Sequence, residues 1–326
     1  MTIEIEHRDA IIIEYSSLLN GEDLSESIKE SLGDEFALGV VLVRNIPNYI
    51  ELRERLLTTI PKLADLPTEA LNKYEVPETK WWIGWSHGKE LRASDKMPDT
   101  NKGSFYFNPI FDSPGTLEER KNDINLWHPN VWPSEVEEFE PVCKAMAKLM
   151  VSVGKLVARQ CDSYCEKSIA DYIPGTIEQV VGTSRCHKAR ALHYFPSIDQ
   201  VQTAKDNLCG WHLDNSMLTA LTRPLYNGNG KFVESDDSGL FIKTRDGKIA
   251  SVSIPKDCLA FQTGEALQIF TNDMIKATPH CVSSSKELSH LSRNTLAIFM
   301  QPESEFQLKN DFKFKDFCQD VLKRHH

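Results

Sequence analysis

From about residue 180 the chain becomes a series of short apolar segments separated by turns, and this pattern constrains the fold most. Asn-Gly-Asn-Gly at 227–230 and Asp-Gly at 246–247 are turn sequences, because both residue types adopt backbone angles that others avoid. Eight short strands at this spacing predict a double-sheet jelly roll. The candidate strands are residues 191–195, 211–213, 218–222, 239–243, 249–254, 258–263, 266–271 and 295–300.

The first half of the chain shows a different spacing. Apolar residues recur every three or four positions over 135–161, which predicts a long amphipathic helix packed on a sheet. Residues 78–115 are rich in Trp, Gly, Ser, Asp and Pro and predict an irregular, functional loop region. Shorter elements are a strand at 38–44 and helices at 51–63, 67–71 and 311–323.

These patterns together predict an α+β, mainly β fold, with a distorted double-stranded β-helix (jelly roll) core and flanking helices. We expect three regions in one compact unit. Residues 1–180 form a mixed helical region packed on the core, residues 181–305 form the jelly roll, and residues 306–326 form a C-terminal helix.

Composition excludes some classes of function. The net charge of −10 argues against nucleic-acid binding, which needs a basic face. Eight cysteines include no Cys-x2-Cys pair, so a zinc ribbon is not expected. The sequence shows no secretory leader and no apolar run of membrane-spanning length, so we expect a cytoplasmic protein with reduced thiols and no membrane partner. The oligomeric state is left open.

One strand carries a pair of candidate metal ligands. His212 and Asp214 are two residues apart, so on a strand both side chains point to the same face. His280, in Thr-Pro-His-Cys-Val, supplies a third ligand if its strand lies alongside. Two histidines and one carboxylate bind one face of Fe(II) and leave the other open for oxygen and a co-substrate. The sequence therefore predicts a mononuclear iron site.

A short motif of this kind also occurs by chance. The chain contains a second His-x-Asp, His7 and Asp9, near its N-terminus, and we expect no metal there. His290 lies close to the proposed third ligand but lacks its sequence setting. Two histidines and a carboxylate also suit a zinc hydrolase, which stays an alternative.

Further segments extend the pattern beyond the ligands. The chain resembles the Fe(II)/2-oxoglutarate-dependent dioxygenases, in the isopenicillin N synthase-like branch. The resemblance covers most of residues 36–302 and is stronger in the C-terminal half. The similar segments are 212–221, Gly-Glu-Ala-Leu-Gln-Ile-Phe-Thr-Asn at 264–272, 278–282, Phe-Met-Gln-Pro at 299–302 and, more loosely, 39–47 and 66–74. One departure is Cys281, which stands where the family commonly has Arg.

The resemblance implies roles for other residues. Arg293 would bind the distal carboxylate of 2-oxoglutarate, since a guanidinium suits bidentate carboxylate recognition. Thr295, two residues on, would add a hydroxyl. His193 would share a strand face with Phe195 and could line the pocket, although Phe195 lacks the hydroxyl that the family often places there.

The function that this implies is a non-haem iron(II) oxygenase that uses dioxygen. It would couple oxidative decarboxylation of 2-oxoglutarate to hydroxylation, desaturation or ring closure of an unidentified small organic substrate. Two alternatives remain open beside the zinc hydrolase. One is an iron oxidase of the same fold that uses no 2-oxoglutarate, and the other is a non-catalytic jelly-roll binding protein.

Overall fold

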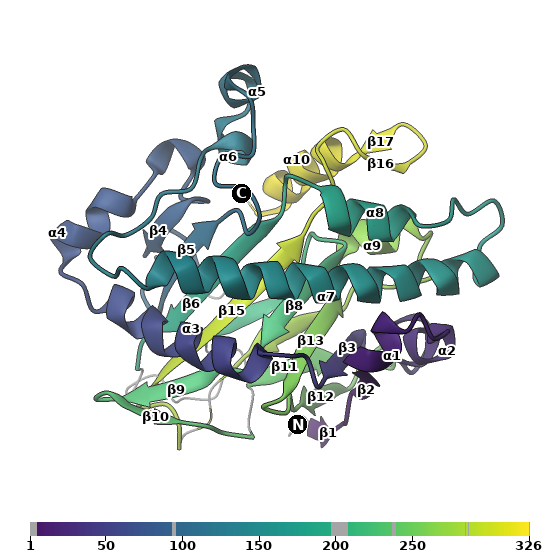
Figure 1. Cartoon of the computed structure of the whole chain (residues 1–326), viewed down its shortest axis with the longest axis horizontal. Helices are drawn as coiled ribbons and strands as arrows, with labels where there is room; N and C mark the ends of the chain where they lie inside the picture. Colours follow the sequence, from purple (N-terminus) through teal and green to yellow (C-terminus); the bar gives the residue numbers. More distant parts are fainter. Residues whose placement is uncertain are drawn as a thin grey trace.

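Two β-sheets face each other, and helices cover the outer face of the larger sheet (Figure 1). The computed structural model describes residues 5–92, 96–196, 208–236, 239–283, 285 and 287–325. Residues 93–95 of the predicted loop region lie outside these ranges. So do residues 197–207, 237–238, 284 and 286 of the expected jelly roll, and residues 1–4 and 326 at the chain ends. The expected α+β, mainly β fold with a jelly-roll core is confirmed.

The larger sheet has strands from both halves of the chain. Its order is β2-β3-β13-β8-β15-β6-β5-β4, with the β9-β10 hairpin attached to β15. The bounds are β2 (Ile11–Glu14), β3 (Val40–Arg44), β4 (Gly84–His87), β5 (Lys102–Phe107), β6 (Lys188–Tyr194), β8 (Leu218–Thr222), β9 (Leu225–Gly228), β10 (Lys231–Val233), β13 (Cys258–Thr263) and β15 (Ser292–Met300).

The smaller sheet has the order β1-β12-β11-β14-β7. Its edge pair, β14 and β7, brings His280 directly opposite His212. The bounds are β1 (Ile5–His7), β7 (Cys209–His212), β11 (Leu240–Lys243), β12 (Ile249–Val252) and β14 (His280–Val282), and β16 (Gln307–Lys309) with β17 (Phe312–Lys313) forms a separate hairpin.

The longest helix, α7 (Phe139–Ser168), crosses the larger sheet beside α3 (Tyr49–Ala64), as Figure 1 shows. Its buried face repeats at helical spacing, which is why the sequence pattern predicted it. The other α-helices are α1 (Tyr15–Leu19), α2 (Ser25–Ile28), α4 (Thr68–Leu71), α5 (Leu117–Asn122), α6 (Ile124–Trp127), α8 (Thr176–Thr183), α9 (Glu265–Phe270) and α10 (Phe314–His325). Lys29–Gly33 is a π-helical turn, and Asn72–Tyr74 and Pro77–Thr79 are 3₁₀-helical turns.

Strand alternation divides the buried side chains into two layers. On β3, Val41 and Val43 join the large core between the sheet and the helices, whereas Val40 and Leu42 join the core between the two sheets. On β15, Leu296 belongs to the helix side. The residues on either side of it therefore face the space between the sheets, and this space contains the pocket described below.

Two predictions about local structure are wrong. Residues 266–271 were predicted as a strand, but residues 266–270 belong to α9 and Thr271 caps it. Ala266, Leu267, Ile269 and Phe270 follow helical spacing and lie among good helix formers. The predicted irregular region 78–115 contains β4 and β5, which extend the larger sheet. Its aromatic residues are strand formers, and the Gly and Asp residues around them concealed this.

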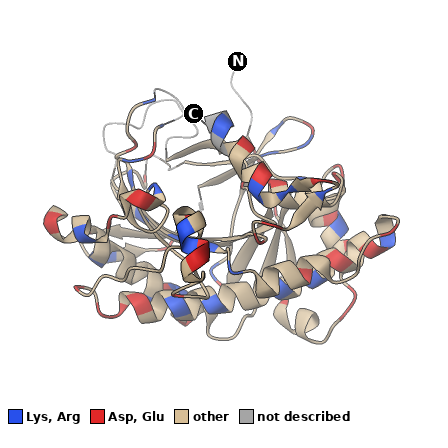
Figure 2. Cartoon of the chain, turned by 90° about the horizontal axis from the view of Figure 1, so that it is seen from above, with Lys and Arg blue, Asp and Glu red and all other residues tan. Residues whose placement is uncertain are grey.

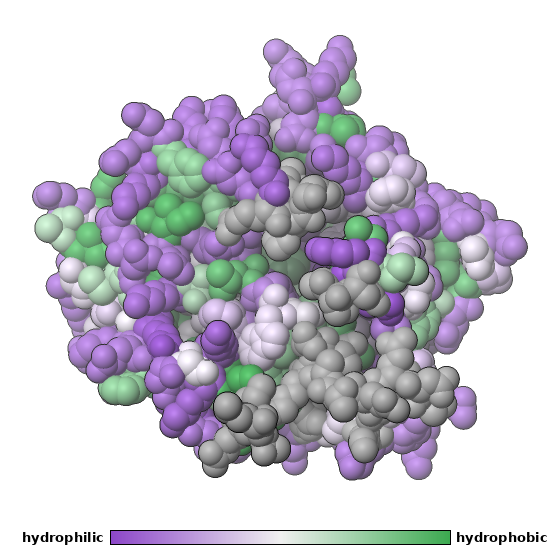
Figure 3. All heavy atoms as spheres, turned by 180° about the vertical axis from the view of Figure 1, so that it is seen from behind, coloured by the Kyte–Doolittle hydropathy of each residue, from purple (hydrophilic) through white to green (hydrophobic). Residues whose placement is uncertain are grey.

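Basic residues (blue) and acidic residues (red) are interspersed along the helices (Figure 2). The face seen from behind Figure 1, on the other side from α3 and α7, is mainly hydrophilic and has separate hydrophobic areas (Figure 3). In the part of the chain that the structure describes, no helix combines the length and apolar character needed to cross a membrane.

Candidate iron and 2-oxoglutarate site

The three predicted metal ligands meet between the two sheets. His212 is the last residue of β7, Asp214 follows two positions later, and His280 begins β14. Asp214 Oδ1 lies 3.7 Å from His212 Nε2 and 3.9 Å from His280 Nε2. One ligand atom from each residue lies within 4.8 Å of the others. Atoms at this separation can bind one ion placed between them.

Backbone carbonyls fix the orientation of both imidazoles. His212 Nδ1 donates to the carbonyl of Gly210 at 2.8 Å, and His280 Nδ1 donates to that of Thr278 at 2.9 Å. A proton on Nδ1 leaves the lone pair of Nε2 directed toward the common centre. These carbonyls are the supporting partners that metal-binding histidines require, and the sequence could not identify them.

The carboxylate and its surroundings fit a bound cation. Asp214 is buried, and among the described residues its Oδ2 has no hydrogen-bond partner. Burial and the neighbouring His212 lower the pKa of His280 to about 4, which favours the neutral, ligating form. Burial opposes a charged His212, but Cys209 and Asp214 outweigh it and raise the pKa of His212 to about 9. This site therefore favours positive charge beside Asp214, which a divalent ion would supply.

A glycine fixes the backbone next to the carboxylate. Gly264 donates its N–H to the carbonyl of Met217 at 3.1 Å, and the next residue, Glu265, donates to that of Asp214 at 2.7 Å. A Cβ atom on Gly264 would lie 2.1 Å from the carbonyl oxygen of Ser216. Only glycine allows this approach, so Gly264 is a supporting residue that the ligand motif alone does not reveal.

Arg293 and Thr295 line the same pocket, from β15. Arg293 is 6% exposed, and its guanidinium carbon lies 5.3 Å from the centre of the Tyr194 ring. The hydroxyl of Thr295 donates to the carbonyl of Thr222 at 3.0 Å. The structure thus brings both predicted co-substrate residues to the pocket, and their contacts with 2-oxoglutarate stay a prediction.

His193 does not line this pocket, so the predicted pocket role for it is corrected. Its ring packs against Phe195, with centroids 4.6 Å apart, and its Nδ1 lies 2.8 Å from Oδ1 of Asn294. His193 and Phe195 do share a strand face, as predicted, but the face opposite the pocket. Tyr194 takes the pocket side instead, opposite Arg293 on β15. The sequence predicts that side chains on a strand alternate between its two faces, but not which of the two faces lines the pocket.

The other sequence candidates stay outside the site. His7 Nε2 lies 3.5 Å from Asp9 Oδ1, and both side chains are exposed. His290 is exposed as well. Among the described residues, His212, Asp214 and His280 are the only group of three or more potential ligands close enough to hold one metal ion.

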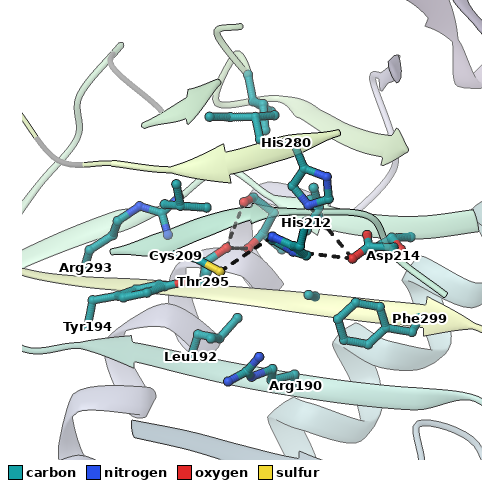
Figure 4. A pocket seen from close by; sticks show the side chains of 17 residues that line it. Arg190, Leu192, Tyr194, Cys209, His212, Asp214, His280, Arg293, Thr295 and Phe299 are labelled. Atoms are coloured by element: carbon teal, nitrogen blue, oxygen red, sulfur yellow. Dashed lines mark hydrogen bonds and ion pairs between the residues drawn. The ribbon is translucent and has the colours of Figure 1, made fainter. Parts of the chain in front are cut away.

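Figure 4 shows the arrangement of the pocket, with Arg293 and Tyr194 at one end and the three metal ligands farther along. Apolar residues make up much of the wall between them. Residues that sequence reasoning missed also line it, above all Tyr194, Cys209, Arg190 and Phe299.

Comparisons with known proteins agree with this geometry. No family model matches the chain, and a search of curated proteins found no match in sequence. Solved structures do match. A candidate 2OG-Fe(II) oxygenase family protein from Caulobacter crescentus has a TM-score of 0.74 and 18% identity, covering 99% of this chain and 100% of that chain.

Two further structures have known ligands or activities. T7H of Neurospora crassa, in complex with alpha-KG and thymine, has a TM-score of 0.67 and 21% identity over 91% of this chain and 86% of that chain. The rice dioxygenase for auxin oxidation has a TM-score of 0.62 and 15% identity over 97% and 95%. The chain therefore has the fold of the 2OG-Fe(II) oxygenases, as the sequence resemblance implied.

Proposed function

We propose that this protein is an Fe(II)/2-oxoglutarate-dependent oxygenase that oxidises a small organic molecule. One observation carries the proposal. A single pocket contains a convergent His-Asp-His set and, from the facing sheet, a buried arginine. Two histidines and a carboxylate leave positions of an iron ion open, and the arginine matches the distal carboxylate of 2-oxoglutarate.

Each residue has a distinct part in this function. His212, Asp214 and His280 would hold iron, which when bound supplies the activation of dioxygen coupled to decarboxylation of 2-oxoglutarate. Arg293 would hold the co-substrate by its far end and so orient it toward the metal. The carbonyls of Gly210 and Thr278 keep the imidazoles directed at one centre. Hydroxylation, desaturation and ring closure all remain compatible with this site.

The lining of the pocket supports a small substrate. Leu192, Leu221, Leu240, Ile254 and Val282 form apolar parts of the wall, and polar side chains stand between them. A lining that combines apolar surface with polar groups is typical of a small-molecule site, in which the polar groups set the orientation of the ligand. T7H, a structure of similar fold, holds thymine together with alpha-KG. We propose a ligand of comparable size for this chain.

Succinate formation tests the proposal. Purified protein, Fe(II), 2-oxoglutarate and a reductant are incubated with and without oxygen, and succinate is measured by mass spectrometry. We expect oxygen-dependent succinate in wild type, even slowly without substrate, and none in Asp214→Ala. Oxygen consumption without succinate would indicate the oxidase alternative. Absence of iron binding and of oxygen consumption would indicate a binding protein, and hydrolysis by a zinc-loaded protein would indicate a hydrolase.

A further inference from the structure

Four charged side chains form a cluster beside the pocket, and the proposed chemistry does not use them. Arg190 Nη2 on β6 forms an ion pair with Glu90 Oε1 at 2.6 Å. Lys102 Nζ on β5 forms two, with Glu90 Oε2 at 3.1 Å and with Asp99 Oδ2 at 2.9 Å. Their side chains are 14% (Arg190), 38% (Glu90), 9% (Lys102) and 8% (Asp99) exposed. Arg190, Lys102 and Asp99 are largely removed from water, so their charges need partners, and this cluster supplies them internally.

Neighbouring side chains hold Arg190 in place. Its Nε donates to Ser104 Oγ at 2.9 Å, and its guanidinium carbon lies 4.9 Å from the centre of the Tyr106 ring. The Tyr106 hydroxyl donates to Glu90 at 2.8 Å. Among the described residues, Nη1 of Arg190 has no hydrogen-bond partner, while Nε and Nη2 are engaged. The arginine is thus fixed in position and retains donor capacity.

Arg190 lines the pocket at a distance from the co-substrate end. On β6, Tyr194 lies opposite Arg293, and Arg190 lies four residues farther along, opposite Ala297. Four residues of strand span about 13 Å. Figure 4 shows Arg190 and Phe299 on the neighbouring strands below the metal ligands, away from Arg293. A co-substrate held between Arg293 and the metal would therefore leave Arg190 to the substrate.

The charge balance of the cluster restricts what Arg190 can accept. The cluster has two cations and two anions, and Glu90 already serves as the counterion of Arg190. Although burial opposes it, Arg190 and Lys102 keep the pKa of Glu90 well below its usual range, so Glu90 stays ionised. A substrate carboxylate bound at Arg190 would lie near this ionised group, and the two like charges would repel each other. A neutral carbonyl would accept a hydrogen bond without that repulsion.

We propose that Arg190, positioned by Glu90, is a specificity-determining residue that binds a neutral carbonyl group of the substrate, such as an amide, imide or lactam, and selects against carboxylates. This inference rests on the proposed function, because it assigns the co-substrate to the Arg293 end. It makes Glu90 a positioning residue whose charge sets the preference. The cluster then determines substrate class, in addition to joining β5 and β6.

A matched pair of probes tests the proposal. Benzamide and benzoate have the same ring and nearly the same shape, and differ in a neutral or an anionic head group. Their dissociation constants are measured by ligand-observed NMR on protein saturated with Mn(II) and 2-oxoglutarate. We expect wild type to bind benzamide at least tenfold more tightly than benzoate.

Two variants separate recognition from structure. Arg190→Met keeps the length of the side chain and should weaken benzamide binding at least tenfold. Glu90→Gln keeps the shape, removes the counterion, and should raise benzoate affinity until the preference disappears or reverses. Glu75→Gln is the control, because Glu75 pairs with Lys89 at 2.9 Å in the same region but does not line the pocket. It should retain the wild-type preference.

The outcomes distinguish this inference from the proposed function. Calorimetry first measures binding of Mn(II) and 2-oxoglutarate to each variant, and both should match wild type. Failure of the wild-type protein to bind them would refute the proposed function. This inference alone would be overturned if metal and co-substrate bind normally but wild type and Arg190→Met bind the probes with equal affinity. The same holds if neither protein binds either probe. Tighter binding of benzoate than benzamide by wild type would also overturn it.

Discussion

Replacing Gly264 by alanine should damage the metal site without touching a ligand. The added Cβ would lie 2.1 Å from the carbonyl oxygen of Ser216 and 2.9 Å from that of Asp214. Real Cβ atoms essentially never come closer than 3.0 Å, so the segment that carries Asp214 has to move by roughly 1 Å. The backbone at Gly264 has φ −109°, which alanine adopts freely, so the effect is steric.

Two magnitudes follow from this displacement. Overpacking of a filled interior costs about 1–3 kcal/mol in the free energy of unfolding. Loss of support for a metal ligand typically lowers metal affinity by about ten- to a hundredfold. Gly264→Ala should therefore unfold at lower urea concentration than wild type, and calorimetry with Mn(II) under anaerobic conditions should show the weaker affinity.

Gly182→Ala is the matched control. Gly182 lies in α8, where an added Cβ would meet only the flexible side chain of Lys155, at 3.0 Å. Glycine in a helix costs about 0.5–1 kcal/mol relative to alanine, so this variant should be slightly more stable than wild type and bind metal unchanged. Wild-type metal affinity and stability in Gly264→Ala would refute the steric argument.

Three further predictions concern other parts of the molecule. Asp214→Ala should abolish binding of Fe(II) in an anaerobic titration while His7→Ala changes nothing, and retention of one tightly bound iron by Asp214→Ala would disprove the ligand assignment. Arg293→Ala removes a charged donor worth about 1.5–3 kcal/mol, so 2-oxoglutarate affinity measured by calorimetry should fall about ten- to a hundredfold, with partial recovery in Arg293→Lys. Burial lowers the pKa of Lys188 from 10.5 to about 8. The charged form therefore destabilises the folded protein by its full amount below pH 8, and this destabilisation decreases as the pH rises from 8 to 10.5. Lys188→Met should therefore be more stable than wild type in urea at pH 7, with a margin that shrinks toward pH 10.5, and a constant margin would contradict this.

The sequence predicted the elements whose patterns are local. The strands at 218–222 and 258–263 and the long helix around 135–161 follow from hydrophobic spacing within a few turns or residues. It failed where tertiary structure decides between two patterns. The segment at 266–271 is compatible with both periods by its apolar residues, and packing against the core selects α9.

The candidate site shows the same division. His212 and Asp214 could be found because their spacing on one chain segment has a chemical meaning. The sequence could not predict which face of β6 lines the pocket. Tyr194 and His193 are neighbours on this strand and point to opposite faces of the sheet, and the pocket lies on the side of Tyr194. Arg190 was missed for a similar reason, because its importance depends on Glu90, 100 residues away in the chain.

Titration of 2-oxoglutarate into metal-free and Mn(II)-loaded protein by calorimetry tests the central claim most directly. The claim is that one pocket holds the metal on His212, Asp214 and His280 and the co-substrate between that metal and Arg293. We predict one 2-oxoglutarate per chain, bound tightly only when metal is present, and weak or undetectable binding by Asp214→Ala under the same conditions. Equal affinity with and without metal, or no binding by the metal-loaded wild type, would contradict the claim.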